Sequence, residues 1–349
     1  MKISARKILI GLVIVIVIAV IVLRGDQLVE LAETVKRGSI VPLLIAVATQ
    51  LCKYFSQSFA YKFCFEAVDE QVSAKSMLPL VFGTFFMNTI APSLNLAGTT
   101  LVVDDARRRG IEPGKATSAA LLMQLTVDSA FMCIMVLTFA ALFFTVGLEP
   151  GWFLLGLIVL FIVSCMAGLL FLGHKKPSAL VKVLTPVQNF INRVLVKFKK
   201  NPMKPWVDST VAGFSSAAGM IGRNPKTALK AFGCSIAASC CELACFCLVG
   251  VGFGVVSPQP LVCGYVVATL FAMVSITPQG VGVVEAAVTV AFTAFGSTAA
   301  AGIAIGLVYR SIVFWMPFLI GAVLINFTGT FKGSKSSKKK EGERPHVRK

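Results

Sequence analysis

The sequence predicts an all-α, polytopic membrane protein, and three observations support that prediction. The chain has 349 residues, of which 56% are hydrophobic and only 14% charged, whereas an ordinary soluble domain has about 25% charged residues. Its mean hydropathy is +0.83. Several apolar runs approach or exceed the roughly 20 residues that a helix needs to cross a bilayer. We therefore expect about six transmembrane helices, two re-entrant or broken helical hairpins that form an inverted repeat, and an interfacial amphipathic helix.

The positive charge of the chain is concentrated beside the apolar runs. The formal net charge is +17, and 16 of the 33 basic residues lie in segments 175–204 and 332–349. A soluble protein with this charge would be a candidate for nucleic-acid binding, but basic segments beside membrane helices mark the cytoplasmic side and contact anionic lipid. We therefore expect membrane lipids, anionic or phosphate-bearing, as partners and no nucleic acid. The sequence leaves open whether the chain forms a homo-oligomer.

The N-terminal third contains two expected helices and the first broken stretch. The apolar run 8–23 follows three basic residues and lacks a small-x-small cleavage site, so we expect an uncleaved helix with its N-terminus inside. A second helix is expected at 40–65. The apolar stretch 76–103 is interrupted at Asn88 and Pro92, and three arginines follow it. A hairpin broken at Pro92 would enter and leave on the cytoplasmic face, in agreement with those arginines.

The middle of the chain is expected to cross the membrane outward over 115–146 and back over 152–172. Segment 174–204 then combines many basic residues, no acidic residue and apolar residues at helical spacing. That pattern is typical of a helix lying in the membrane interface. Further helices are expected at 227–251 and 298–327.

These elements predict one integral membrane domain, residues 1–330, with repeat-like halves at about 76–146 and 261–327. A basic tail, 331–349, is expected to be cytoplasmic and disordered. Both termini are then inside.

The second broken stretch combines residues that a straight membrane helix would not benefit from. Pro278 removes a backbone donor, and Gly280 and Gly282 loosen the helix. Broken backbone at membrane depth is tolerated only where it is buried in protein or lines a watery cavity. Glu285 is costly in hydrocarbon and therefore a functional-site candidate.

The two broken stretches resemble each other. Each has an aromatic-rich half-helix, an Ile-x-Pro break, glycine and a later carboxylate, and an Ala-rich helix follows that contains Asp128 or Arg310. Inverted repeats with discontinuous helices place the substrate near the bilayer midplane. The candidate substrate-binding residues are Asn88, Pro92, Asn95, Gly98, Thr99, Asp128, Pro278, Gln279, Gly280, Gly282, Glu285 and Arg310.

Two interpretations of Arg310 are open. In the functional one, Arg310 receives a lipid phosphate while Glu285 or Asp128 balances its charge in the empty site. In the structural one, a permanent bridge to either carboxylate locks the bundle. Two interpretations are also open for the amide side chains of Asn88, Asn95 and Gln279. They either contact substrate or cap the backbone groups that are freed at the breaks. The glycines serve backbone geometry more than ligand contact.

No catalytic residue, metal site or cofactor is expected. The ten cysteines lie almost entirely in apolar segments, where small thiols fill helix interfaces. The only histidines, His174 and His346, lie in basic flanking segments. General acid-base or metal chemistry usually needs histidine or an acidic cluster, so we expect a protein that is not an enzyme.

The core Pro278-x-Gly280-x-Gly282-x-x-Glu285, the later Arg310 and the upstream Asn88-x-x-x-Pro92 resemble the flippase-like family of the lysylphosphatidylglycerol synthase transmembrane region. The resemblance covers about residues 8–330. It implies a multi-pass protein of a bacterial or archaeal cytoplasmic membrane, and some members are linked to flipping a lipid with a charged head group. Full-length synthases also have a soluble aminoacyl-transfer domain, and we do not expect that activity here.

This chain departs from the family pattern in its first half. Many members have Gly-Gly-Glu after the first break, where this chain has Ala97-Gly98-Thr99, and many have Glu-Arg where Gln124 and Leu125 precede Asp128. The first half of this chain therefore lacks charged residues that many members have at these positions.

The expected function is a lipid flippase or transporter that moves a phospholipid or polyprenyl-phosphate head group by alternating access. No ATP-binding motif is present in the sequence, so movement would be passive or ion-coupled. The alternatives are a membrane enzyme or an accessory scaffold in lipid or cell-envelope biosynthesis.

Overall fold

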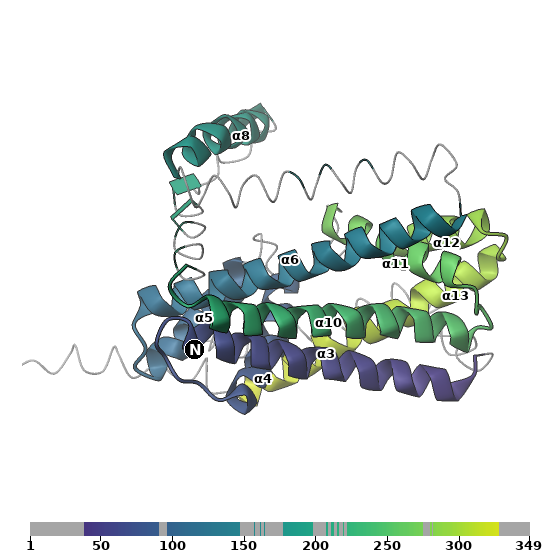
Figure 1. Ribbon diagram of the computed structural model, residues 1–349, viewed down its shortest axis with the longest axis horizontal. Helices are drawn as coiled ribbons and strands as arrows, with labels where there is room; N and C mark the ends of the chain where they lie inside the picture. The colour runs from purple at the N-terminus through teal and green to yellow at the C-terminus, as the bar shows by residue number, and fades with distance from the viewer. Residues whose placement is uncertain are drawn as a thin grey trace, which may run out of the picture. The chain divides into compact units, whose positions relative to one another are not determined.

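The computed structural model describes residues 38–90, 96–146, 177–197, 222–274 and 280–327 except residue 281, and isolated positions between 157 and 219. These residues form helices joined by short turns, and none of them lies in a strand (Figure 1). The prediction of an all-α protein is therefore confirmed.

Four helical runs in the described part of the chain are long and apolar enough to cross a membrane. They are α3 (Ile40–Glu66), α6 (Pro113–Val146), α10 (Pro225–Gly252) and the run Ala299–Leu324. Each coincides with an expected crossing. The helices expected at 8–23 and 152–172 fall on residues that the structure does not describe, apart from isolated positions in the second. The total of about six crossings therefore stays a prediction.

The sequence predicted one continuous helix for the last of these runs, but the structure divides the run into three segments. It consists of α13 (Ala299–Arg310), a π-helical segment η2 (Ser311–Trp315) and α14 (Met316–Phe327). The Met316 N–H donates to the carbonyl of Ser311, five residues earlier. Pro317 has no N–H, and its ring would clash with the carbonyl four residues before it. A widened turn at this point accommodates the proline without ending the helix.

Each broken stretch consists of two short helices. The first stretch forms α4 (Ala74–Ile90) and α5 (Leu96–Arg108), and the second forms α11 (Pro258–Val274) and α12 (Val283–Ala294). In the second stretch, α12 packs against both α11 and α13. The side from which each stretch enters the membrane, and the inverted repeat, remain predictions.

The described chain forms two compact units. The first contains the chain up to Tyr54, the segment Leu78–Arg108 and the chain from Glu242 onward. Just before α3, the N–H of Ser39 donates a hydrogen bond of 2.7 Å to the carbonyl of Gly252, the last residue of α10. This bond joins the start of α3 to the end of α10.

An aromatic cluster fills the core of this first unit. The ring of Phe246 on α10 is buried, and its centroid lies 4.8 Å from that of Tyr309 on α13 and 6.3 Å from that of Phe292 on α12. Phe86 on α4 packs against Phe318 on α14, with centroids 5.1 Å apart. The first three rings connect α12 and α13 to α10, and the last two connect α4 to α14.

The second unit contains Phe55–Met77 and Arg109–Cys241. In this unit α10 contacts α6, because the Ser235 hydroxyl on α10 donates a hydrogen bond of 3.1 Å to the Thr126 hydroxyl on α6. Lys115 near the start of α6 pairs with Glu70 over 2.7 Å. Both contacts join segments of this unit that are far apart in the sequence.

Helix α8 (Pro177–Lys197) lies in the segment expected to be an interfacial helix, and it continues through Pro186. Val183 and Phe190, seven residues apart and therefore on one face, are 51% and 63% exposed. Lys182 and Arg193 are also exposed. An exposed apolar face beside basic residues fits a helix at a lipid surface.

Candidate functional site

The chain reverses direction between α11 and α12 at two glycines. Gly280 and Gly282 have φ of +74° and +87°, a region that residues with a Cβ rarely adopt. A Cβ on Gly280 would also lie 2.9 Å from the Cα of Ala272 on α11. Glycine at position 280 therefore permits both the turn and the close approach of α12 to α11.

The first turn of α12 is capped by its own glutamate. The Gly282 N–H donates to Oε2 of Glu285 over 2.7 Å. A carboxylate in this position also interacts favourably with the positive end of the helix dipole. One oxygen of Glu285 is therefore occupied by the backbone of its own helix.

Two glycines on α13 bring this helix very close to α12. A Cβ on Gly302 would lie 2.7 Å from the Cα of Thr289, and a Cβ on Gly306 would lie 3.3 Å from the Cα of Glu285. This Gly-x-x-x-Gly spacing is common where membrane helices pack backbone to backbone. The next residue along the same face, four positions on, is Arg310.

Arg310 is buried, with a relative exposure of 5%. Its Nε lies 3.6 Å from Oε1 of Glu285, which is an electrostatic contact but too long for a hydrogen bond. The guanidinium carbon lies 4.7 Å from the ring centroid of Phe314 in the π-helical segment. Nε and Nη2 have no hydrogen-bond acceptor among the described residues.

We call Arg310, Glu285 and the backbone N–H groups at the start of α12 the Arg310 site. A buried guanidinium with unused donors is costly. The helix N-terminus adds further positive potential, whereas Glu285 contributes a single negative charge. The arrangement therefore suits an additional anion, because a phosphate or carboxylate matches the fork of an arginine.

At the first break, Asn88 caps the following helix. Its Oδ1 accepts a hydrogen bond of 2.6 Å from the N–H of Gly98, in the first turn of α5. A Cβ on Gly98 would lie 2.7 Å from the Asn88 side-chain nitrogen, so the cap also requires a glycine. The next residue, Thr99, is half-buried.

The other predicted site residues lie elsewhere. Pro92, Asn95, Pro278 and Gln279 lie outside the described residues. Asp128 lies on α6 in the second unit, where its Oδ1 accepts a hydrogen bond from Gln124 over 2.8 Å. The sequence suggested Glu285 and Asp128 as carboxylate partners of Arg310, and the structure places Glu285 beside it.

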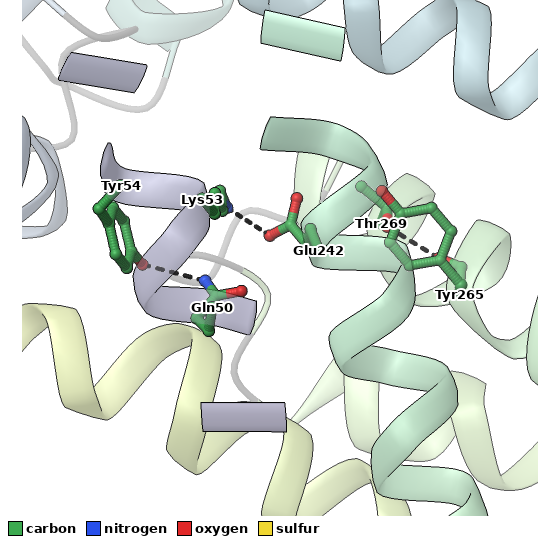
Figure 2. A network of polar contacts seen from close by, with 6 residues as sticks. All are labelled: Gln50, Lys53, Tyr54, Glu242, Tyr265 and Thr269. Carbon is green, nitrogen blue, oxygen red and sulfur yellow. Dashed lines mark hydrogen bonds and ion pairs between the residues drawn. The ribbon is translucent and has the colours of Figure 1, made fainter. Parts of the chain in front are cut away.

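An ion pair inside two apolar helices was not predicted from the sequence. Lys53 on α3 lies 2.6 Å from Oε1 of Glu242 on α10, and their side chains are 14% and 17% exposed. Figure 2 shows the two groups pointing toward each other, beside the hydrogen bond of 3.1 Å that Gln50 donates to Tyr54. The sequence did contain a signal for this pair, because a basic and an acidic residue each lie within an apolar segment, where an unpaired charge is costly.

No group of three or more histidine, cysteine, aspartate and glutamate residues that could hold a metal is found among the residues that the structure describes. The nine cysteines in that part of the chain form no disulfide with one another.

Residues 8–321 match the family described as the lysylphosphatidylglycerol synthase TM region, and this range includes both broken stretches and the Arg310 site. A search of curated proteins finds no match to the chain.

Proposed function

Because this chain belongs to the family of the lysylphosphatidylglycerol synthase transmembrane region, we propose that it is a lipid translocator. It moves a phospholipid or polyprenyl-phosphate head group across the cytoplasmic membrane by alternating access. Glycine-rich breaks in short apolar helices are typical of transporters that bind substrate near the midplane.

The observation that supports this proposal best is the unused hydrogen-bonding capacity of Arg310. The side chain is buried in a span of apolar residues, yet Nε and Nη2 lack acceptors among the described residues. A lipid phosphate supplies acceptor oxygens in the geometry that a guanidinium prefers. The backbone N–H groups at the start of α12 add a second anion-binding element.

Glu285 serves as the internal counterion of the empty site. Its Oε1 lies 3.6 Å from Nε of Arg310, close enough to offset the charge but without a hydrogen bond that substrate would have to break. A phosphate therefore competes with a weak contact rather than with a strong bidentate pair.

The exposed basic and apolar residues of α8 support contact with anionic lipid at the cytoplasmic surface. With the basic N-terminal and C-terminal segments, they support a cytoplasmic location of both termini. Protease accessibility of terminal tags in oriented vesicles measures this orientation. A C-terminal tag that the protease cleaves only from the side corresponding to the cell exterior contradicts this orientation.

The function is tested by lipid scrambling in vesicles. The full chain is reconstituted into liposomes that contain fluorescent phosphatidylglycerol, phosphatidic acid or polyprenyl phosphate, and an impermeant quencher then reports the lipid exposed on the outer leaflet. We expect faster quenching with protein than without it for at least one of these lipids. Equal rates with and without protein across the whole panel refute the proposal.

Variants connect the activity to the Arg310 site. Arg310→Met/Glu285→Gln removes both charges, so no unpaired ion remains, and we expect its scrambling rate to fall to that of protein-free vesicles. Arg108→Met is the matched control, because Arg108 pairs with Asp104 at an exposed position on α5. Both variants must elute as monodisperse protein in size-exclusion chromatography. Wild-type scrambling by the double variant excludes Arg310 as the anion-binding residue.

A further inference from the structure

The second unit contains a polar cavity at the C-terminal end of α3, which the function proposed above does not use. Its volume is about 290 Å³, and it is lined by Lys62, Glu66, Glu70, Gln71 and Val72. Pockets for small ligands measure roughly 300–1,000 Å³. The cavity is therefore large enough for a lipid head group but not for a whole lipid.

Two of the charged side chains that line this cavity are unpaired. Lys62 and Glu66 are four residues apart on α3, a spacing at which opposite charges often form an ion pair. Neither side chain forms an ion pair with the other or with another residue that the structure describes. Glu70, in contrast, lies 2.7 Å from Lys115. The cavity therefore offers one unpaired cation and one unpaired anion to a ligand.

A second ammonium group, from α10, lies close to that of Lys62. The Nζ atoms of Lys62 and Lys230 each lie 5.6 Å from the ring centroid of Phe63, so they are no further apart than twice that distance. The start of α10 is held here because the Asn224 amide donates a hydrogen bond of 3.2 Å to the carbonyl of Ala67, directly after α3. Lys230 also has no ion pair with a described residue. Two ammonium groups beside one ring repel each other, and an anion between them would offset this repulsion.

This end of α3 extends to the level of the lipid head groups. The helix has 27 residues, more than the roughly 20 that cross the hydrocarbon core. Phe59, one turn before Phe63, is 47% exposed, and Leu229, next to Lys230, is 68% exposed. A Cβ on Gly233 would meet nothing within 4 Å. Exposed apolar surface beside the charged groups suits the acyl chains of a lipid.

We propose that Lys62, Lys230 and Glu66 bind the head group of a phospholipid with a primary ammonium group, of the phosphatidylethanolamine type. The two lysines hold the phosphate, and the carboxylate of Glu66 accepts hydrogen bonds from the ammonium group. Two carbon atoms join phosphate and ammonium through one oxygen in such a head group. Lys62 and Glu66 are one helical turn apart, so both contacts can form at once. This site consists of other residues than the Arg310 site and does not depend on the proposed function.

Native mass spectrometry of the full chain in detergent tests the head-group preference. The protein is mixed with equal amounts of phosphatidylethanolamine, phosphatidylcholine and phosphatidylglycerol with the same acyl chains, and each bound lipid is counted. Phosphatidylcholine has three methyl groups on its nitrogen, so it cannot donate hydrogen bonds to Glu66. We expect wild type to retain phosphatidylethanolamine about five- to tenfold more than phosphatidylcholine, the effect of one charge-assisted hydrogen bond at a partly exposed site.

A variant of the glutamate tests the contact with the ammonium group. Glu66→Gln should abolish the preference for phosphatidylethanolamine, and it leaves no orphaned ion because Glu66 is unpaired. Asp69→Asn is the matched control, since it removes an exposed carboxylate three residues away that does not line the cavity. Asparagine tolerates the positive φ of this position. This control should keep the preference.

Variants of the lysines test the contact with phosphate. Lys62→Met/Lys230→Met should lose retention of both phosphatidylethanolamine and phosphatidylcholine. Lys226→Met is the control, because Lys226 is exposed one turn before Lys230, and it should retain both lipids. The preference for phosphatidylethanolamine should also persist in Arg310→Met/Glu285→Gln, which lacks the Arg310 site.

Four results would overturn the inference. They are equal retention of phosphatidylethanolamine and phosphatidylcholine by wild type, a preference that survives Glu66→Gln, loss of the preference in Arg310→Met/Glu285→Gln, and stronger retention of phosphatidylglycerol than of phosphatidylethanolamine. Water-soluble glycerophosphoethanolamine at the same concentration should not displace the lipid, because it lacks acyl chains. Displacement would assign the cavity to a soluble ligand and so refute a lipid site. The scrambling assay tests the proposed function separately from all of these results.

Discussion

The energetic dependence of Arg310 on Glu285 can be predicted from their geometry. Two unit charges 3.6 Å apart attract by about 4–5 kcal/mol at an effective dielectric constant near 20. The contact is too long for a hydrogen bond and Glu285 is 18% exposed, so the loss on Glu285→Gln should lie near the lower end of values for broken buried pairs, about 3 kcal/mol. The glutamine oxygen still accepts from the Gly282 N–H, so the helix cap is retained.

A double-mutant cycle measures this interaction. The free energy of unfolding of wild type, Glu285→Gln, Arg310→Met and the double variant is determined in mixed micelles by circular dichroism. We expect the double variant to be about 2–3 kcal/mol more stable than the sum of the single changes implies. The more exposed pair of Glu70 and Lys115 is the control and should give a much smaller interaction free energy, because solvent screens it.

Two results would refute the reasoning. If the losses in unfolding free energy of the two single variants add up to the loss of the double variant, Glu285 does not compensate the charge of Arg310. The lipid response gives an independent check, because Glu285→Gln leaves Arg310 without a competing carboxylate. Phosphatidylglycerol should therefore stabilise this variant more than wild type, and a smaller stabilisation would contradict the assignment of Glu285 as the internal counterion.

Two further predictions concern helix packing and capping, both measured by unfolding in the same micelles. Asn88→Ala removes the cap on Gly98 and should cost about 1 kcal/mol; an unchanged stability would show that the cap contributes nothing. Gly321→Ala places a Cβ against the carbonyl of Phe82 on α4 and should cost about 1–3 kcal/mol. Gly233→Ala, whose Cβ meets open space, should instead gain up to about 1 kcal/mol from helix propensity, and equal effects at the two glycines would contradict the packing argument.

The helices were predictable because apolar length alone decides which segments can cross a bilayer. The expected crossing at 40–65 is α3 (Ile40–Glu66), and that at 227–251 is α10 (Pro225–Gly252). The π-helical segment before Pro317 was not predicted. Proline in a membrane helix can end it, kink it or widen one turn, and the packing of neighbouring helices selects among these outcomes.

The site was predicted less completely than the helices. Glu285 and Arg310 were singled out because each is a costly charge in an apolar segment, and the structure places them beside each other. The partner of Glu242 was missed although Lys53 carries the opposite charge in another apolar segment. The two residues are 189 positions apart, and only the packing of α3 against α10 brings them together.

The sequence by itself determined that this chain is an all-helical membrane protein, where its helices break, and which charges are too costly to be accidental. Those properties follow from local composition, since the transfer of each residue from water to lipid depends on its own chemistry. The tertiary structure decided which charges meet. Gly302 and Gly306 let α13 approach α12 closely enough to set Arg310 beside Glu285, and contacts between segments distant in sequence depend on helix packing that no local pattern specifies.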